Sequence, residues 1–152
     1  MTNTPALRIG DSSAQIAAES VLLAAASKAL GVELSPSRVH VGDVYIDVDG
    51  VDPGRTVLVE ATAMIGAPKA AQQKKLAADV LKLGWASRTL GDVRCVIVTW
   101  SPEVQAFLSR PRAWLTAARL EAGVELILAE PDDTAFVAVS AARLAQDRYA
   151  ME

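Results

Sequence analysis

The stretch that decides the fold is residues 43–62, DVYIDVDGVDPGRTVLVEAT. Apolar and polar residues alternate on both sides of a turn-forming Gly/Pro cluster at 50–55, and a period of two is typical of β-strands. We predict strands over 39–49 and 57–62, joined as an antiparallel hairpin, and a short strand from Glu33 or later is the alternative third member of this antiparallel group. The alternation places Asp47 on the polar face of the first strand, and a register with Asp47 opposite Glu60 brings their Cα atoms within roughly 5 Å.

Two carboxylates this close repel each other unless one is protonated or a cation lies between them. Carboxylate oxygens are the ligands preferred by Mg²⁺ and similar hard cations such as Mn²⁺, so we expect Asp47 and Glu60 to bind one of these ions. Asp43 lies roughly 13 Å from Asp47 along the strand, too far to join them. Asp49 and Asp52 are interpreted as turn residues that favour the bend.

A helix is predicted over about 13–30, because Ser12 and Gln15 resemble a capping box and Gly31 is a typical helix end. Glu19 falls within its apolar stripe, where a carboxylate is costly unless it is paired or bound to a metal. Glu19 is therefore either a third metal ligand or a residue at the margin of the stripe that reaches water.

The rest of the chain alternates helix and strand. The pattern predicts a helix from Pro68 to about Leu83, a strand over 93–99, a helix over 102–122 interrupted at Pro111, and a strand over 124–128. Residues 132–149 are either helical throughout or contain a strand at 135–139. With residues 1–11 as a loose arm, the 152 residues form one α/β (α+β) domain with a mixed central sheet, an antiparallel hairpin and flanking helices.

Composition excludes several classes of protein. Hydrophobic residues make up 51% of the chain, but no uncharged run has the length of a membrane span and no signal peptide is recognisable, so we expect a cytoplasmic protein without a membrane partner. The single cysteine, Cys95, lies in an apolar run and is interpreted as a buried core thiol. The single histidine, His40, falls on the apolar side of its predicted strand, which favours a core residue over a general base.

Charge is distributed unevenly. The net charge is −3, yet residues 68–119 hold 9 basic and 3 acidic residues, while the segments before and after are acidic. Gln73, Lys74 and Lys75 are the candidates for binding a nucleic-acid backbone, with DNA as the expected partner. The alternative is that these charges cover solvated helix faces.

The order of these features resembles the PD-(D/E)xK nuclease superfamily. Glu19 matches the helix glutamate of that family, Asp47 the strand aspartate, and Glu60-Ala61-Thr62 the acidic-x-Lys motif, so the likeness covers about residues 12–100. The resemblance implies a restriction-endonuclease-like αβββαβ core, here extended by αβα. It also implies a Mg²⁺-dependent hydrolase that cleaves DNA as an endo- or exonuclease.

One position departs from the family pattern, because Thr62 stands where the motif has lysine and cannot supply its positive charge. Some members carry this lysine on the neighbouring helix, and Lys69 is the predicted equivalent, which makes Asp47, Glu60 and Lys69 the expected catalytic residues. The alternative is a catalytically inactive nuclease-fold domain that serves oligomerisation or protein interaction, as a homo-oligomer or within a larger assembly. A third is a small-molecule-binding α/β domain.

Overall fold

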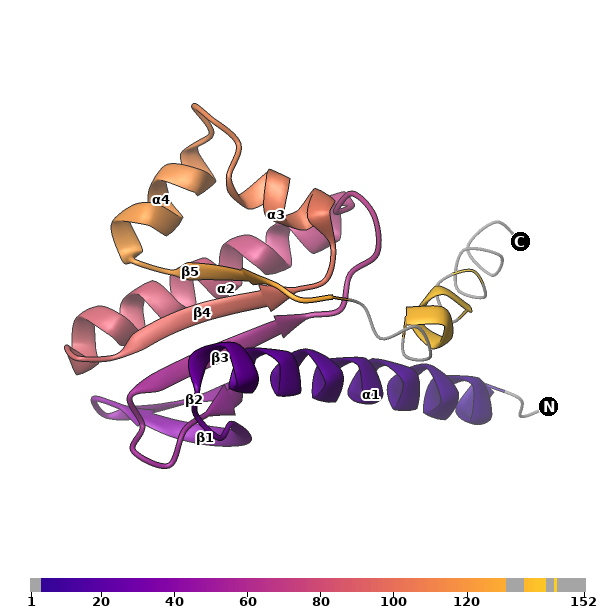
Figure 1. Cartoon of the computed structure of the whole chain (residues 1–152), viewed down its shortest axis with the longest axis horizontal. Helices are drawn as coiled ribbons and strands as arrows, with labels where there is room; N and C mark the ends of the chain where they lie inside the picture. The colour runs from indigo at the N-terminus through magenta and orange to yellow at the C-terminus, as the bar shows by residue number, and fades with distance from the viewer. Residues whose placement is uncertain (1–3, 131–135, 142–143, 145–152) are drawn as a thin grey trace.

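A computed structural model describes residues 4–130, 136–141 and 144 of the chain. It shows a five-stranded mixed sheet with helices on both faces (Figure 1), as the sequence predicted. The elements are α1 (Thr4–Leu30), β1 (Ser35–Val41), β2 (Val44–Val51), β3 (Val57–Thr62), α2 (Ala70–Leu90), β4 (Arg94–Thr99), α3 (Pro102–Leu108), α4 (Trp114–Ala122) and β5 (Glu125–Leu128).

The strands lie in the order β1-β2-β3-β4-β5, which is also their order along the chain. The first three pair antiparallel, whereas β3, β4 and β5 pair parallel. The change from antiparallel to parallel pairing follows from the connections, because a short turn reverses the chain and a helical crossover returns it in the same direction.

The predicted single strand over 39–49 is wrong, since a tight turn at Gly42 and Asp43 divides it into β1 and β2. Gly42 has a φ of 59°, the left-handed conformation that glycine adopts at no steric cost and that two-residue hairpin turns require. Because of this turn, the residues before Gly42 face the opposite way from the prediction. His40 is therefore exposed, with its ring against that of Tyr45, and is not a core residue.

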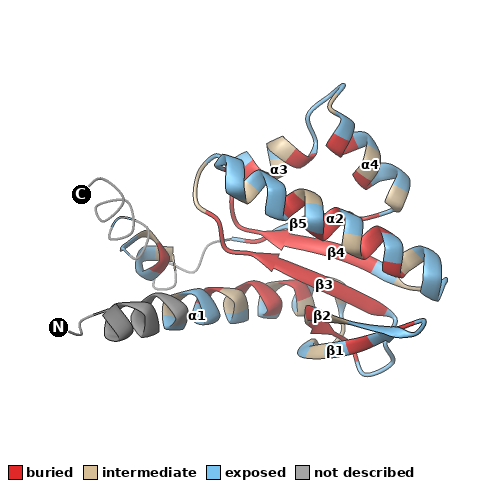
Figure 2. Cartoon of the chain, turned by 180° about the vertical axis from the view of Figure 1, so that it is seen from behind, coloured by how far each residue is buried: buried red, intermediate tan, exposed pale blue. Residues whose placement is uncertain are grey.

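The two faces of the sheet carry separate cores, and β3 and β4 are buried between them (Figure 2). Leu58, Ile97 and their neighbours pack against α2, α3 and α4, whereas Val59, Val96 and their neighbours pack against α1. Strands buried on both faces read as continuous apolar runs, as the sequence of β4 does. Cys95 lies in the core on the side of α2, α3 and α4. It is buried, as predicted, and burial raises the pKa of its thiol to about 11.

Several helix boundaries differ from the prediction. Helix α1 begins at Thr4, so residues 4–11 belong to the helix and not to a loose arm. Helix α2 continues past Gly84 to Leu90, because Gly84 has a packing role: a Cβ there would lie 2.9 Å from the Cβ of Ala122 on α4. Gly84 thus permits the close approach of two helices and does not end one.

The predicted interruption near Pro111 is confirmed and separates α3 from α4. Residues 136–141 are helical, which excludes the alternative of a strand over that part of 135–139; the remainder of the predicted helix over 132–149 lies outside the described residues, apart from position 144. None of the helices in the described ranges combines the length and the apolar character needed to cross a membrane.

Candidate functional site

The site lies where β2 separates from β3. The two strands pair through only two positions, Gly50 with Val59 and Val51 with Leu58. The part of β2 that precedes Gly50 in the chain pairs with β1 and not with β3. We call this point of separation the fork.

A bulge in β2 determines which side chains face the fork. Ser35 and Ser37 of β1 pair with Val51 and Val48, so three steps of β2 oppose two steps of β1. A bulge of this kind interrupts the alternation of side chains. As a result Val48 belongs to the core on the α2 side, and Asp49, one residue later, is directed to the same side.

At the fork, the side chain of Asp49 accepts a hydrogen bond from a backbone N–H of β3, as a backbone carbonyl of a paired strand would do. Its Oδ2 accepts a hydrogen bond of 2.8 Å from the backbone N–H of Ala61, two residues past Val59, the last β3 position that pairs with β2. The interpretation of Asp49 as a turn residue was therefore wrong. Asp52 is the turn residue, because its carboxylate accepts hydrogen bonds from the backbone N–H groups of Thr56 and Val57.

Glu60 is the buried acid of the fork, with only 4% of the residue exposed. Burial is the main reason that its pKa rises to about 8. A hydrogen bond with Asp49 and the charge of that carboxylate raise the pKa further, while Lys82 opposes both. The protonated Glu60 carboxyl can donate to Asp49, which removes the repulsion that two adjacent carboxylates would suffer.

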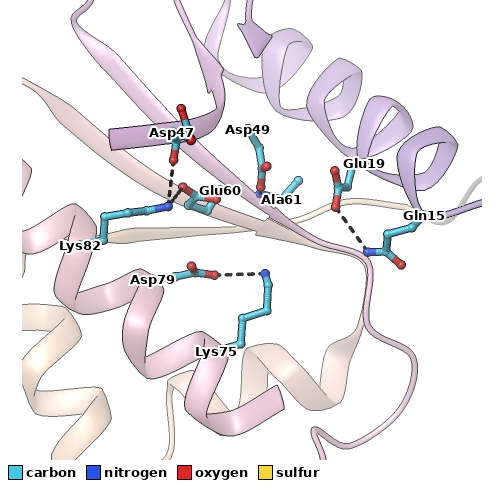
Figure 3. A network of polar contacts seen from close by, with 9 residues as sticks. All are labelled: Gln15, Glu19, Asp47, Asp49, Glu60, Ala61, Lys75, Asp79 and Lys82. Atoms are coloured by element: carbon cyan, nitrogen blue, oxygen red, sulfur yellow. Dashed lines mark hydrogen bonds and ion pairs between the residues drawn. The ribbon is translucent and has the colours of Figure 1, made fainter. Parts of the chain in front are cut away.

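Lys82 reaches the fork from α2, as Figure 3 shows. Its Nζ lies 2.5 Å from Oε1 of Glu60 and donates a 3.0 Å hydrogen bond to the backbone carbonyl of Asp47. The lysine side chain is 30% exposed, so its ammonium group joins a buried acid to the surface. This contact places a positive charge beside Glu60, whereas Thr62, buried on the same strand, carries no charge.

One turn away on α2, Lys75 and Asp79 form a second ion pair, with 3.5 Å between Nζ and Oδ2. Burial raises the pKa of Asp79, and the charges of Lys75 and Lys82 oppose this effect. Lys75, Asp79 and Lys82 are spaced by four and three residues, so they share one face of the helix. That face is directed to the fork (Figure 3).

Glu19 contributes from α1 and lies on the side of the helix towards Asp49 (Figure 3). Burial and the charge of Asp49 raise its pKa, and a hydrogen bond from Gln15 and the charge of Lys75 oppose them. Four elements, α1, β2, β3 and α2, therefore direct charged groups to one region. Glu19 is half-buried on α1, and it does not join Asp49 and Glu60 in a group of three side chains that could hold a metal ion.

The structure places two of the predicted catalytic residues, Asp47 and Lys69, away from the Glu60 carboxyl. The carboxylate of Asp47 lies on the opposite face of the sheet from Glu60, where it pairs with Arg38 at 2.9 Å and is 74% exposed. The Arg38 guanidinium holds the pKa of Asp47 below its ordinary value. The predicted Asp47–Glu60 pairing is wrong because the bulge makes Asp49 the partner.

Lys69 is not the lysine at the fork. It precedes the first residue of α2 and lies thirteen residues before Lys82, about 20 Å along the helix axis. The α2 lysine that contacts Glu60 is Lys82. Of the predicted nucleic-acid contacts, Lys75 joins the fork, whereas Gln73 and Lys74 are exposed on other sides of α2.

Two patterns in the sequence indicate features of the site that the prediction did not use. The Gly42-Asp43 pair between apolar residues is a hairpin signal, and it removes the basis for counting faces from residue 39. Lys75, Asp79 and Lys82 form a charged stripe at helical spacing, separate from the apolar stripe of α2. The bulge at Asp49 has no comparable local signal.

Few side chains at the fork could bind a metal ion. Within the described ranges, no three acidic, histidine or cysteine side chains converge closely enough to hold a metal ion by themselves. Asp49 and Glu60 are a pair of carboxylates, and proteins typically hold Mg²⁺ through one or two carboxylates together with water and substrate phosphate. Two carboxylates have the oxygen chemistry that Mg²⁺ or Mn²⁺ uses, and they do not provide the closed cage typical of structural zinc.

Comparison with known proteins identifies no relative, since no protein-family model, no curated protein and no solved structure matches the chain. The geometry of the fork is therefore the basis for assigning a function.

Proposed function

We propose that this protein is a divalent-cation-dependent phosphodiesterase of the PD-(D/E)xK type, acting on nucleic acid at the fork. The observation that carries the proposal is the contact between Lys82 and the buried Glu60, beside Asp49. An aspartate and a glutamate on adjacent strands, with a lysine at the glutamate, are the groups that phosphodiester hydrolysis requires in this class.

Each group has a chemical role. Asp49 and Glu60 would hold Mg²⁺, which neutralises phosphate charge and lowers the pKa of a bound water. Lys82 would place a positive charge beside the attacked phosphate, the role that Thr62 cannot fill. Lys75 is the second cation at the fork, while Glu19 and Asp79 add negative charge that favours cation binding.

Binding of the cation depends on the protonation of Glu60. Its pKa of about 8 means that protons compete with a metal ion for this carboxylate at neutral pH. Metal affinity is therefore expected to rise from pH 6 to pH 9, at a fixed concentration of Mg²⁺. The activity should follow the same trend.

The test compares the wild type with the variants Asp49→Asn, Glu60→Gln and Lys82→Met on labelled single-stranded DNA, duplex DNA and RNA, with Mg²⁺ or Mn²⁺. All three variants should lose cleavage. Asp47→Asn is the control, because it changes a nearby exposed acid and retains the backbone carbonyl that Lys82 contacts. Equal cleavage by the wild type and Glu60→Gln would show that the activity does not arise at the fork.

A second candidate is the catalytically inactive domain that serves protein interaction. The favouring observation is that the Glu60 carboxyl already contacts a side chain of the protein itself, Lys82, while the motif position holds Thr62. Calorimetric titration with Mn²⁺ distinguishes the two functions. Binding that disappears in Asp49→Asn supports the enzyme, whereas no binding and no cleavage by a folded wild type supports the inactive domain.

A further inference from the structure

A second feature of the molecule, separate from the fork, is a groove of about 430 Å³ between α2 and the α3–α4 segment, which lie beside each other in Figure 1. Its lining includes Gln73, Lys74, Phe107, Arg110 and Trp114, and none of the lining residues is acidic. In a chain of net charge −3, a groove with two cations and no acid is a local concentration of positive charge.

Trp114 is the most exposed tryptophan of the chain, with 74% of its surface accessible, whereas Trp100 is buried in the core. Exposing an indole of this size sacrifices the burial that normally stabilises a tryptophan. The indole stands at the first residue of α4, where it borders the groove. An exposed, rigid ring beside cations provides a surface on which a planar group can stack.

The cations of the groove come from two elements. Lys74 is on the exposed side of α2, and Arg110 lies in the loop between α3 and α4, where its guanidinium is 5.6 Å from the centre of the Phe107 ring. Ala113, also in the lining, is the N-cap residue of α4 and offers no side-chain cap, and the first turn of α4 holds no acid. Its first backbone N–H groups add a partial positive charge at this end of the groove.

We infer that the groove binds one nucleotide of a single-stranded nucleic acid, with the base stacked on Trp114 and the flanking phosphates contacting Lys74 and Arg110. An unpaired strand fits better than a duplex, because duplex bases are stacked on each other and cannot present a ring face to an indole. The inference rests on the proposed function and narrows its substrate to unpaired strands.

The groove lies away from the catalytic residues. Gln73 and Ala77 line it, and each is two residues, about 200° around the helix, from Lys75. The groove and the fork are thus on opposite flanks of α2. Variants of one should leave the other unchanged, which allows binding and cleavage to be measured separately.

The experiment measures binding of a fluorescein-labelled twelve-residue oligothymidylate in EDTA, where no cation-dependent cleavage occurs. Trp114→Ala should weaken binding by roughly five- to a hundredfold, and Trp114→Phe should retain most of it because the ring face remains. Lys74→Glu with Arg110→Glu should weaken it at low salt and reduce the slope of log affinity against log salt by about 1.4.

Lys28→Glu with Arg88→Glu is the matched control, because it makes the same change of charge at two exposed positions outside the groove lining. The control should bind like the wild type. Equal weakening by the control and the groove variant would overturn the inference, since the effect would then report net charge alone.

Other ligands distinguish the chemistry of the occupant. Thymidine monophosphate, the oligothymidylate–oligoadenylate duplex and polyglutamate should each bind more weakly than the single strand. Equal binding of any of them would overturn the inference. If the single strand does not bind but the fork cleaves nucleic acid, the inference fails and the proposed function stands; if it binds but is not cleaved, the reverse holds.

Discussion

The protonation of Glu60 predicts how the stability of the protein depends on pH. The folded-state pKa of this carboxyl, about 8, lies above its ordinary value of 4.5. The folded chain therefore holds a proton that the unfolded chain releases between these two values. It follows from linkage that the free energy of unfolding falls as pH rises through this range.

The perturbation that isolates this effect is Glu60→Gln. Glutamine has nearly the same shape, carries no charge, and can donate to Asp49 as the protonated carboxyl does. Between pH 5 and pH 8 the wild type should lose about 3 to 4 kcal/mol relative to the variant, since each pKa unit corresponds to about 1.4 kcal/mol. Glu60→Gln should therefore be the more stable protein at pH 8 and similar to the wild type at pH 5.

The measurement is urea unfolding of both proteins, followed by circular dichroism at several pH values from 5 to 8.5 in EDTA. Other titrating groups contribute equally to both curves, so the difference between them reports Glu60. Asp47→Asn is the control, because its carboxylate is exposed and its difference from the wild type should not grow over this range. A difference between Glu60→Gln and the wild type that stays constant from pH 5 to 8.5 would refute the reasoning.

Three further predictions concern packing and buried charge, two of them at the fork and one in α4. Lys82→Met should lower stability by about 2 kcal/mol at pH 8.5 and by less at pH 5, where Glu60 is protonated; a loss that does not depend on pH in urea titrations would contradict the ion pair. Gly50→Ala should cost about 1 to 3 kcal/mol, because the new Cβ would lie 2.7 Å from a leucine side chain of α1. Gly54→Ala, whose Cβ meets only ordinary contacts, is its control, and equal melting temperatures of the two variants would disprove the close approach. Arg119→Met should cost about 2 to 4 kcal/mol in thermal unfolding, because the buried guanidinium donates to two backbone carbonyls that would lose their partner; an unchanged melting temperature would show that water replaces these bonds.

Local sequence patterns were sufficient for much of the fold. The alternation of β3, the continuous apolar run of β4 and the glycine after α1 identified these elements and the mixed sheet. The buried Glu60 was also identified from its own strand. These features depend on neighbours within a few residues, so the sequence carries them directly.

The partners of Glu60 were decided by tertiary structure. Asp49, and not the predicted Asp47, lies beside Glu60 because β1 pairs with β2 across a bulge. The bulge adds one residue to β2, and its position depends on the register in which the two strands pair. Lys82, and not the predicted Lys69, contacts Glu60, because the packing of α2 against the sheet determines which turn of the helix lies over the fork.

The amino-acid sequence by itself determined the order of the elements and the strand that carries the glutamate. Only the tertiary structure decided which aspartate and which lysine meet that glutamate. The physical reason is that periodicity specifies a side chain's face within its own element, whereas a contact between elements depends on register, bulges and helix placement that the whole packed core sets together.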